Sequence, residues 1–119
     1  QNWLNISFSV PGYGLLAVAS MFDSESKSYQ NHEIRVELYA NTPASKAAFT
    51  AIETKKEMLE EKLGHELILL NREDQKSARA YTRKPVDLNS ETDWEKQHTW
   101  LLNHLENFQN TFKPFVVKL

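Results

Sequence analysis

The sequence contains no cysteine, only 3 glycines and a formal net charge of only −2. The lack of cysteine excludes a disulfide framework, a thiolate zinc site and a cysteine nucleophile, and it suits a reducing, cytoplasmic location. The scarcity of glycine leaves no glycine-rich phosphate loop, and no nucleophile-elbow motif surrounds any serine. The small net charge argues against a nucleic-acid interface covering the whole domain, so such a contact would need a local basic patch.

Long apolar runs are also missing. The longest, residues 15–19, is far too short to cross a bilayer, and the N-terminus lacks the basic-then-apolar pattern of a signal peptide. We therefore expect no membrane partner. The chain begins at Gln1 rather than Met, so we expect residues 1–119 to be a single domain cut from the C-terminal part of a longer protein.

What is present is typical of one globular core. The 119 residues are 40% hydrophobic and 25% charged, and they include 3 Trp, 6 Phe and 4 Tyr. The hydrophobic periodicity predicts an α+β fold in the order βββ-α-ββ-α, an antiparallel sheet of about five strands with two helices packed on one face. The expected strands are residues 3–10, 15–22, 32–40, 65–71 and 77–83, with a polar loop over 23–31.

Capping signals set the expected helix ends. Thr42 as N-cap and Pro43 in the first turn predict a helix that ends before Gly64. A capping box at residues 90–93 predicts the start of a second helix, which Pro114 ends, and Pro85 ends the last strand. The predicted buried core consists of Ile34, Val36, Leu38, Phe49, Ile52, Leu59, Trp94, Leu101, Leu105 and Phe108.

Four stretches carry a resemblance to a known family. They are Asn2-Trp3-Leu4, the strand 33–39 (EIRVELY), the helix 49–64 with Lys55-Lys56 and Leu63-Gly64, and the helix 93–114 with Trp94, Trp100-Leu101, Phe108 and Phe112-Lys113-Pro114. Together they resemble an uncharacterised bacterial and archaeal domain of unknown function. The resemblance implies a C-terminal domain of a longer protein, in some cases attached to a restriction-nuclease-like region, and hence a DNA-linked or defence role for the parent. It implies no catalytic residue here.

The pattern that most resembles a catalytic site is a pair of carboxylates on either side of a guanidinium, namely Glu33 and Glu37 around Arg35. A metal-dependent nuclease needs acidic side chains within one metal-coordination shell, so these glutamates are the candidate ligands of an enzyme. The alternative is a solvated sheet face on which they pair with Arg79 and Arg83 of a neighbouring strand. We favour the ion pairs, because exposed strand faces are routinely built in this way, and we expect no metal there.

The segment 72–84 is the one basic region. Its candidate nucleic-acid-binding residues, which could hold phosphates and stack a base, are Arg72, Lys76, Arg79, Tyr81 and Arg83. The competing interpretation is that Arg79 and Arg83 are used in pairs with the glutamates, and we favour it because the net charge is close to zero.

The last predicted helix carries two further candidates. Trp100 and His104, four residues apart, could anchor a partner protein or could cap the edge of the core, and we favour the core. Glu95 and His98 have the Glu-x-x-His spacing of di-iron sites, but such sites need carboxylates from other helices. We expect His98 to lie at the top of the core, with no metal and no cofactor.

These observations favour a non-catalytic accessory binding or interaction module of a larger cytoplasmic protein. Its expected partners are the rest of that parent protein and either nucleic acid or another protein. The alternative is a metal-dependent, nuclease-like enzyme that uses Glu33 and Glu37.

Overall fold

The computed structural model describes residues 2–6 as backbone and residues 8–20 and 32–118 in full. The predicted polar loop 23–31 lies outside the described residues. The strands are β1 (Asn2–Ile6), β2 (Tyr13–Ser20), β3 (His32–Ala40), β4 (Ile68–Leu70) and β5 (Ala78–Val86). The helices are α1 (Pro43–Thr54), α2 (Lys56–Leu63) and α3 (Trp94–Val117), with a 3₁₀ turn, η1, at Glu91–Asp93.

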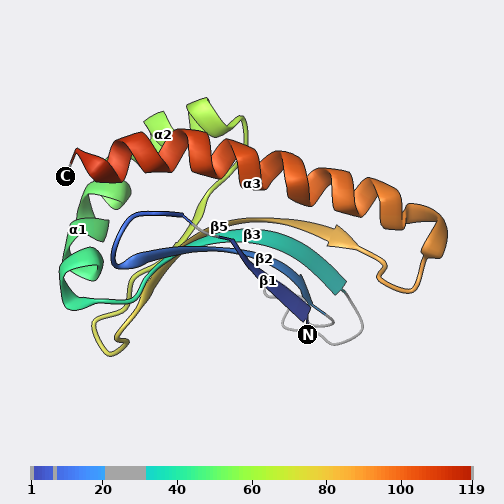
Figure 1. Cartoon of the computed structure of the whole chain (residues 1–119), viewed down its shortest axis with the longest axis horizontal. Coiled ribbons are helices and arrows are strands. Elements are labelled where there is room, and N and C mark those ends of the chain that lie inside the picture. Colours follow the sequence, from blue (N-terminus) through green and yellow to red (C-terminus); the bar gives the residue numbers. More distant parts are fainter. Residues whose placement is uncertain (1, 7, 21–31, 119) are drawn as a thin grey trace.

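The strands form one antiparallel sheet in the order β1-β2-β3-β5-β4. The long helix α3 runs across the sheet, while α1 lies at the end where α3 finishes (Figure 1). The predicted α+β class is therefore confirmed. Among the helices of the described residues, none is long and apolar enough to cross a membrane.

The helix-covered face of the sheet carries the core. Val36 and Leu38 of β3 lie opposite Thr82 and Ala80 of β5, so the even-numbered residues of both strands point to the same side. Eight of the predicted core residues are buried, namely Ile34, Val36, Leu38, Phe49, Ile52, Leu59, Leu105 and Phe108. Those from the helices join Val36 and Leu38 in one cluster, so burial of their apolar surface is what attaches the helices to the sheet.

The N-terminal turns of α3 correct the predicted core. Trp94 is 47% exposed, and its ring N–H donates to the carbonyl of Leu88 at the surface. His98, expected at the top of the core, is also exposed, and Gln97 takes the buried position. Leu101 is partly buried against the core. The buried stripe thus follows the prediction only from Leu101 onward, because the first turns of α3 face the segment after β5 rather than the sheet.

Two helices occupy the span in which one was predicted. The N-terminal prediction is confirmed: the Thr42 hydroxyl accepts from the Ser45 amide at 3.1 Å, and Pro43 opens α1. The C-terminal prediction is confirmed too, since Gly64 adopts the left-handed conformation at φ 70°. Between them, Lys55 leaves the helical region at φ −102° and ψ 19°. The break allows the buried residues of α1 and those of α2 to reach the same core.

Three predicted ends were wrong. Pro85 lies inside β5, where it is tolerated because β4 pairs only with residues 79–81 in the described sheet, so that edge of β5 needs no N–H there. Pro114 lies inside α3, where the buried Phe112 and Val116 on either side outweigh one lost hydrogen bond. The expected capping box is replaced by η1: the Ser90 hydroxyl donates to the Asp93 carboxylate at 2.9 Å instead of capping the backbone.

Candidate functional site

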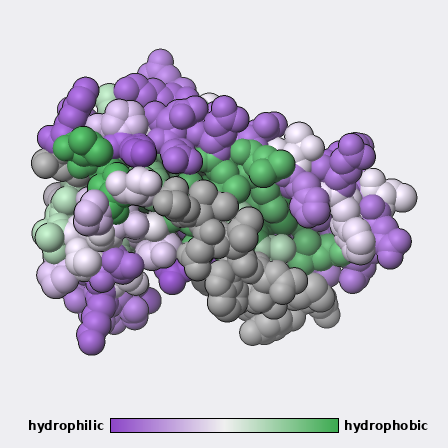
Figure 2. Space-filling model, in the orientation of Figure 1, coloured by the Kyte–Doolittle hydropathy of each residue, from purple (hydrophilic) through white to green (hydrophobic). Residues whose placement is uncertain are grey.

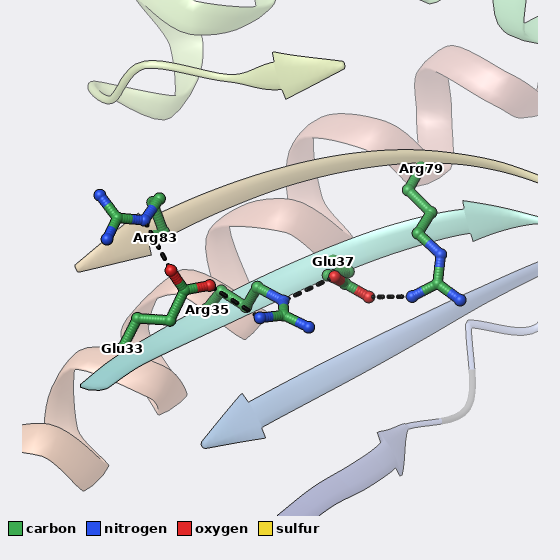
Figure 3. A network of polar contacts seen from close by, with 5 residues as sticks. All are labelled: Glu33, Arg35, Glu37, Arg79 and Arg83. Carbon is green, nitrogen blue, oxygen red and sulfur yellow. Dashed lines mark hydrogen bonds and ion pairs between the residues drawn. The ribbon is translucent and has the colours of Figure 1, made fainter. Parts of the chain in front are cut away.

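The face of the sheet away from the core carries a chain of ion pairs (Figure 3), here called the arginine–glutamate network and made of Glu33, Arg35, Glu37, Arg79 and Arg83. Arg35 lies between the glutamates on β3, with Nη1 2.7 Å from Glu33 and Nε 2.7 Å from Glu37. From β5, Arg79 approaches Glu37 and Arg83 approaches Glu33, each at 2.8 Å. All four carboxylate oxygens therefore contact a guanidinium.

The sheet register explains these pairs. Arg83 lies opposite Arg35, and Arg79 lies opposite Tyr39, so each cross-strand pair is diagonal rather than direct. The predicted ion pairs between the two strands are confirmed. The predicted solvated face is wrong, since the side chains of Glu33 and Glu37 are 0% and 3% exposed.

Burial changes what these charges do. An ion leaves water only at a cost of several kcal/mol, and full pairing with good hydrogen bonds offsets most of that cost. Burial by itself would lower the pKa of Arg35, but the charges and hydrogen bonds of Glu37 and Glu33 raise it above its ordinary value. The Arg35 guanidinium also lies 5.9 Å from the centre of the Tyr81 ring. Pairing with both glutamates thus holds the buried Arg35 guanidinium in its charged form.

This pairing bears on metal chemistry. A divalent cation between Glu33 and Glu37 would have to displace the guanidinium of Arg35 from both carboxylates. Among the residues that the structure describes, no group of three or more His, Cys, Asp or Glu side chains could hold a metal ion. His98 and Glu95, with their di-iron spacing, both lie exposed on α3.

The structure divides the predicted nucleic-acid-binding residues into two groups. Arg72 and Lys76 are exposed in the β4–β5 turn, and the side chain of Arg79 is 43% exposed. Tyr81 is buried, and the side chain of Arg83 is only 9% exposed within the network. The β4–β5 turn projects from the end of the sheet below α1 as a hydrophilic surface (Figures 1 and 2).

On the helix-covered face, three rings form a second group, here called the histidine–tryptophan cluster and made of His65, Trp100 and His104. The rings of Trp100 and His104, one turn apart on α3, have centroids 4.2 Å apart. His65, from the connection between α2 and β4, meets His104 edge-on at 5.0 Å and Trp100 at 6.1 Å. The Nδ1 atom of His65 is hydrogen-bonded to the hydroxyl of the fully buried Thr82 on β5.

The electrostatics of this cluster differ from those of the network. Burial lowers the pKa of His104, and the positive charges of His65 and Lys84 lower it further. Within the described part of the chain, the buried Nδ1 atom of His104 has no hydrogen-bond partner. His104 is therefore held as a neutral imidazole among groups that oppose its protonation.

Sequence reasoning found part of this cluster. Trp100 and His104 were singled out from their spacing, and Trp100 is half-buried against the core. His65 and Thr82 were missed, because nothing local marks either of them. The one available signal was that His65 follows the Gly64 cap, where the chain leaves α2.

Comparison with known proteins gives one positive result. No curated protein and no solved structure matches this chain. A family model matches residues 1–116, nearly the whole chain. Like the family that the sequence resembles, it describes a domain of unknown function. The chain therefore belongs to the family described as Domain of unknown function (DUF4268).

Proposed function

We propose that this domain is a non-catalytic binding module of a larger cytoplasmic protein, and that it contacts nucleic acid through the β4–β5 turn and Arg79. The observation that carries the non-catalytic part is the pairing of every oxygen of Glu33 and Glu37 with an arginine. A nuclease requires such carboxylates to be open to a metal ion. The parent context implied by the family resemblance, a bacterial DNA-linked or defence protein, supports nucleic acid as the partner.

The start of the turn is anchored to α1, and the exposed Arg72 side chain lies 3.4 Å from Asp74. Lys46 of α1 donates to the side chain of Asn71 at 2.8 Å and to the carbonyl of Arg72 at 2.7 Å. Asn71 in turn donates to Glu53 of α1 at 2.6 Å. These bonds attach the start of the turn to α1, so little backbone entropy is lost at Arg72 when the turn meets a phosphate.

Arg79 extends this surface onto the sheet. One guanidinium nitrogen contacts Glu37, which orients the side chain, while 43% of the side chain is exposed to an incoming ligand. Arg83 and Tyr81 take no part in our proposed contact, because the first is enclosed in the network and the second is buried. The surface thus relies on phosphate contacts rather than on base stacking, which predicts weak, salt-dependent and sequence-independent binding.

The test is fluorescence anisotropy with labelled single- and double-stranded DNA at low salt. The triple variant Arg72→Ala/Lys76→Ala/Arg79→Ala removes three cations from the proposed surface. The control Lys55→Ala/Lys62→Ala/Lys96→Ala removes three exposed cations from α2, from α3 and from the break between α1 and α2. We expect the first to weaken binding and to reduce the log–log salt slope by about two to three units, and the control to change little. Equal effects of both variants, or no wild-type binding at tens of micromolar, would contradict the proposal.

The enzymatic alternative has its own test. Calorimetric titration of the wild-type domain with Mg²⁺ or Mn²⁺ should give no binding heat, because Arg35, Arg79 and Arg83 already satisfy both carboxylates. Binding that disappears in Glu33→Gln/Glu37→Gln would instead support the nuclease-like alternative.

A further inference from the structure

The histidine–tryptophan cluster joins three parts of the chain that are far apart in sequence. Trp100 and His104 belong to α3, and His65 precedes β4. Thr82, which bonds to His65, belongs to β5. The centroid distances of 4.2, 5.0 and 6.1 Å show that the three rings form a triangle in which His104 contacts both Trp100 and His65. The cluster is thus a contact through which the N-terminal half of α3 is attached to the rest of the fold.

We propose that this cluster is an acid-sensitive latch: it holds the N-terminal half of α3 in place while His104 is neutral and releases it when His104 is protonated. This inference is independent of the proposed nucleic-acid contact, which uses the other end of β5.

Protonation of His104 would bury an N–H group without an acceptor. A neutral imidazole has one donor and one acceptor nitrogen, whereas both nitrogens of an imidazolium are donors. Within the described residues, Nδ1 of His104 is buried without any partner, so the charged form would carry an unpaired, desolvated donor. A structure that accommodated the imidazolium would have to move the ring toward water.

The neighbouring charges act in the same direction. The groups that bear on His104 electrostatically are His65, from the α2–β4 connection, and Lys84, from β5, and neither is a carboxylate. The Trp100 ring acts oppositely, because an aromatic face attracts a cation. Burial, His65 and Lys84 together prevail, and they lower the pKa of His104 from its ordinary value of 6.5.

The rest of α3 explains why the release would be local. Its C-terminal half is fixed by the buried side chains of Leu105, Phe108, Phe112 and Val116. In the N-terminal half, Gln97 donates to the carbonyl of Asp87 at 3.0 Å, and Trp94 donates to that of Leu88 at 2.9 Å. Both bonds go to the connecting segment after β5, so the histidine–tryptophan cluster and Leu101 supply most of the remaining attachment to the sheet.

The sign of the pH effect follows from linkage. The folded-state pKa of His104 lies below the unfolded value near 6.5, so the open or unfolded state binds the proton more tightly. The attachment is complete above about pH 6.5 and is lost as the pH falls from there toward the folded-state pKa. Over that window, each pH unit multiplies the opening constant by up to about tenfold for one proton.

Hydrogen exchange measured by mass spectrometry tests this inference, at about pH 7.5 and about pH 5.5, with rates corrected for intrinsic exchange. We expect protection of residues 94–104 to fall severalfold at the lower pH while residues 105–117 stay protected. His104→Phe keeps a ring in contact with Trp100 and His65 but cannot be protonated, so it should remove the pH effect. His98→Gln, on the exposed side of the same helix, should retain it.

Two outcomes would overturn the inference. One is a loss of protection that spreads evenly over the whole chain. The other is a local loss that persists in His104→Phe, which would assign it to another histidine, either His65 of the cluster or His32, whose Nδ1 accepts from the Leu88 amide at 3.0 Å. If His104→Phe does not fold, the His65→Gln variant with an NMR titration of His104 decides. The pKa of His104 must then rise, since one opposing positive charge has been removed, and an unchanged pKa would contradict the latch.

Discussion

The arginine–glutamate network and the histidine–tryptophan cluster lie on opposite faces of β5, and they treat buried polar groups in opposite ways. In the network, every carboxylate oxygen contacts a guanidinium. In the cluster, the buried Nδ1 of His104 lacks a partner among the described residues. Complete pairing keeps the buried Arg35 guanidinium charged, whereas burial without a partner for Nδ1 opposes protonation of His104 and so makes the cluster responsive to a proton. A dense group of charges is therefore not by itself the reactive part of a fold.

The largest expected effect comes from breaking the network at its most buried member. Glu33→Ala leaves Arg35 and Arg83 without their shared carboxylate, and it should lower the free energy of unfolding by about 3–5 kcal/mol. Urea denaturation measures this. Glu33→Gln keeps the shape and some hydrogen bonds and should cost less. A loss below about 1 kcal/mol for Glu33→Ala would mean that the network is solvated after all.

A matched pair of leucines on α3 tests whether the half that carries the cluster is loosely packed. Leu105 is buried in the core, whereas Leu101, beside Trp100, is only partly buried. We expect Leu105→Ala to cost about 2–4 kcal/mol and Leu101→Ala about 1–2 kcal/mol, because the cavity at the more exposed site is open to solvent. Equal losses in chemical denaturation would show that both halves of the helix pack equally well.

Much of the fold was predictable from local patterns. Alternation in residues 32–40 predicted the core side of β3. Thr42, Pro43 and Gly64 mark helix ends that depend only on local side-chain and backbone chemistry. Predictions failed where tertiary contacts outweighed a local preference. Pro85 continues a strand beyond the reach of β4, and Pro114 continues a helix whose next turn is buried.

The sequence predicted more of the arginine–glutamate network than of the histidine–tryptophan cluster. Opposite charges in the segments of β3 and β5 were enough to predict the ion pairs. The structure pairs these two strands directly, in a register that brings the charges together. Their burial was not predictable, because a strand face shows the same alternation of charged residues whether it is exposed to solvent or covered by other parts of the chain. The histidine–tryptophan cluster was harder to predict from the sequence. His65 and His104 meet only after α2, β4, β5 and α3 have packed, so the spacing of Trp100 and His104 could indicate only the two residues on α3.

The hydrogen bond between Thr82 and His65 offers a smaller test on the cluster side of β5. Thr82→Val preserves the shape of the fully buried side chain but removes its hydroxyl, and it should lower the free energy of unfolding by about 1 kcal/mol. Thr82→Ser, which keeps the hydroxyl, is the control for the bond. NMR spectra should also show shifted His65 ring resonances in the valine variant alone, because only that variant lacks the hydroxyl that bonds to the ring. The same result in both variants would mean that the hydroxyl does not position the ring.

The smallest expected effect is that of Arg79→Ala, and it distinguishes the two cross-strand arginines of the network. Arg79 and Arg83 each contact one glutamate at 2.8 Å, but their side chains are 43% and 9% exposed. Because water and salt screen the more exposed pair, Arg79→Ala should cost at most about 1 kcal/mol, and less at high salt. Arg83→Ala leaves the fully buried Glu33 with Arg35 as its remaining partner in the network, so it should cost about 3 kcal/mol with little salt dependence. Urea denaturation at low and high NaCl compares the variants directly. Equal costs would show that exposure does not divide the network, and Arg79 would then be as structural as Arg83 and a poor candidate for contacting a ligand.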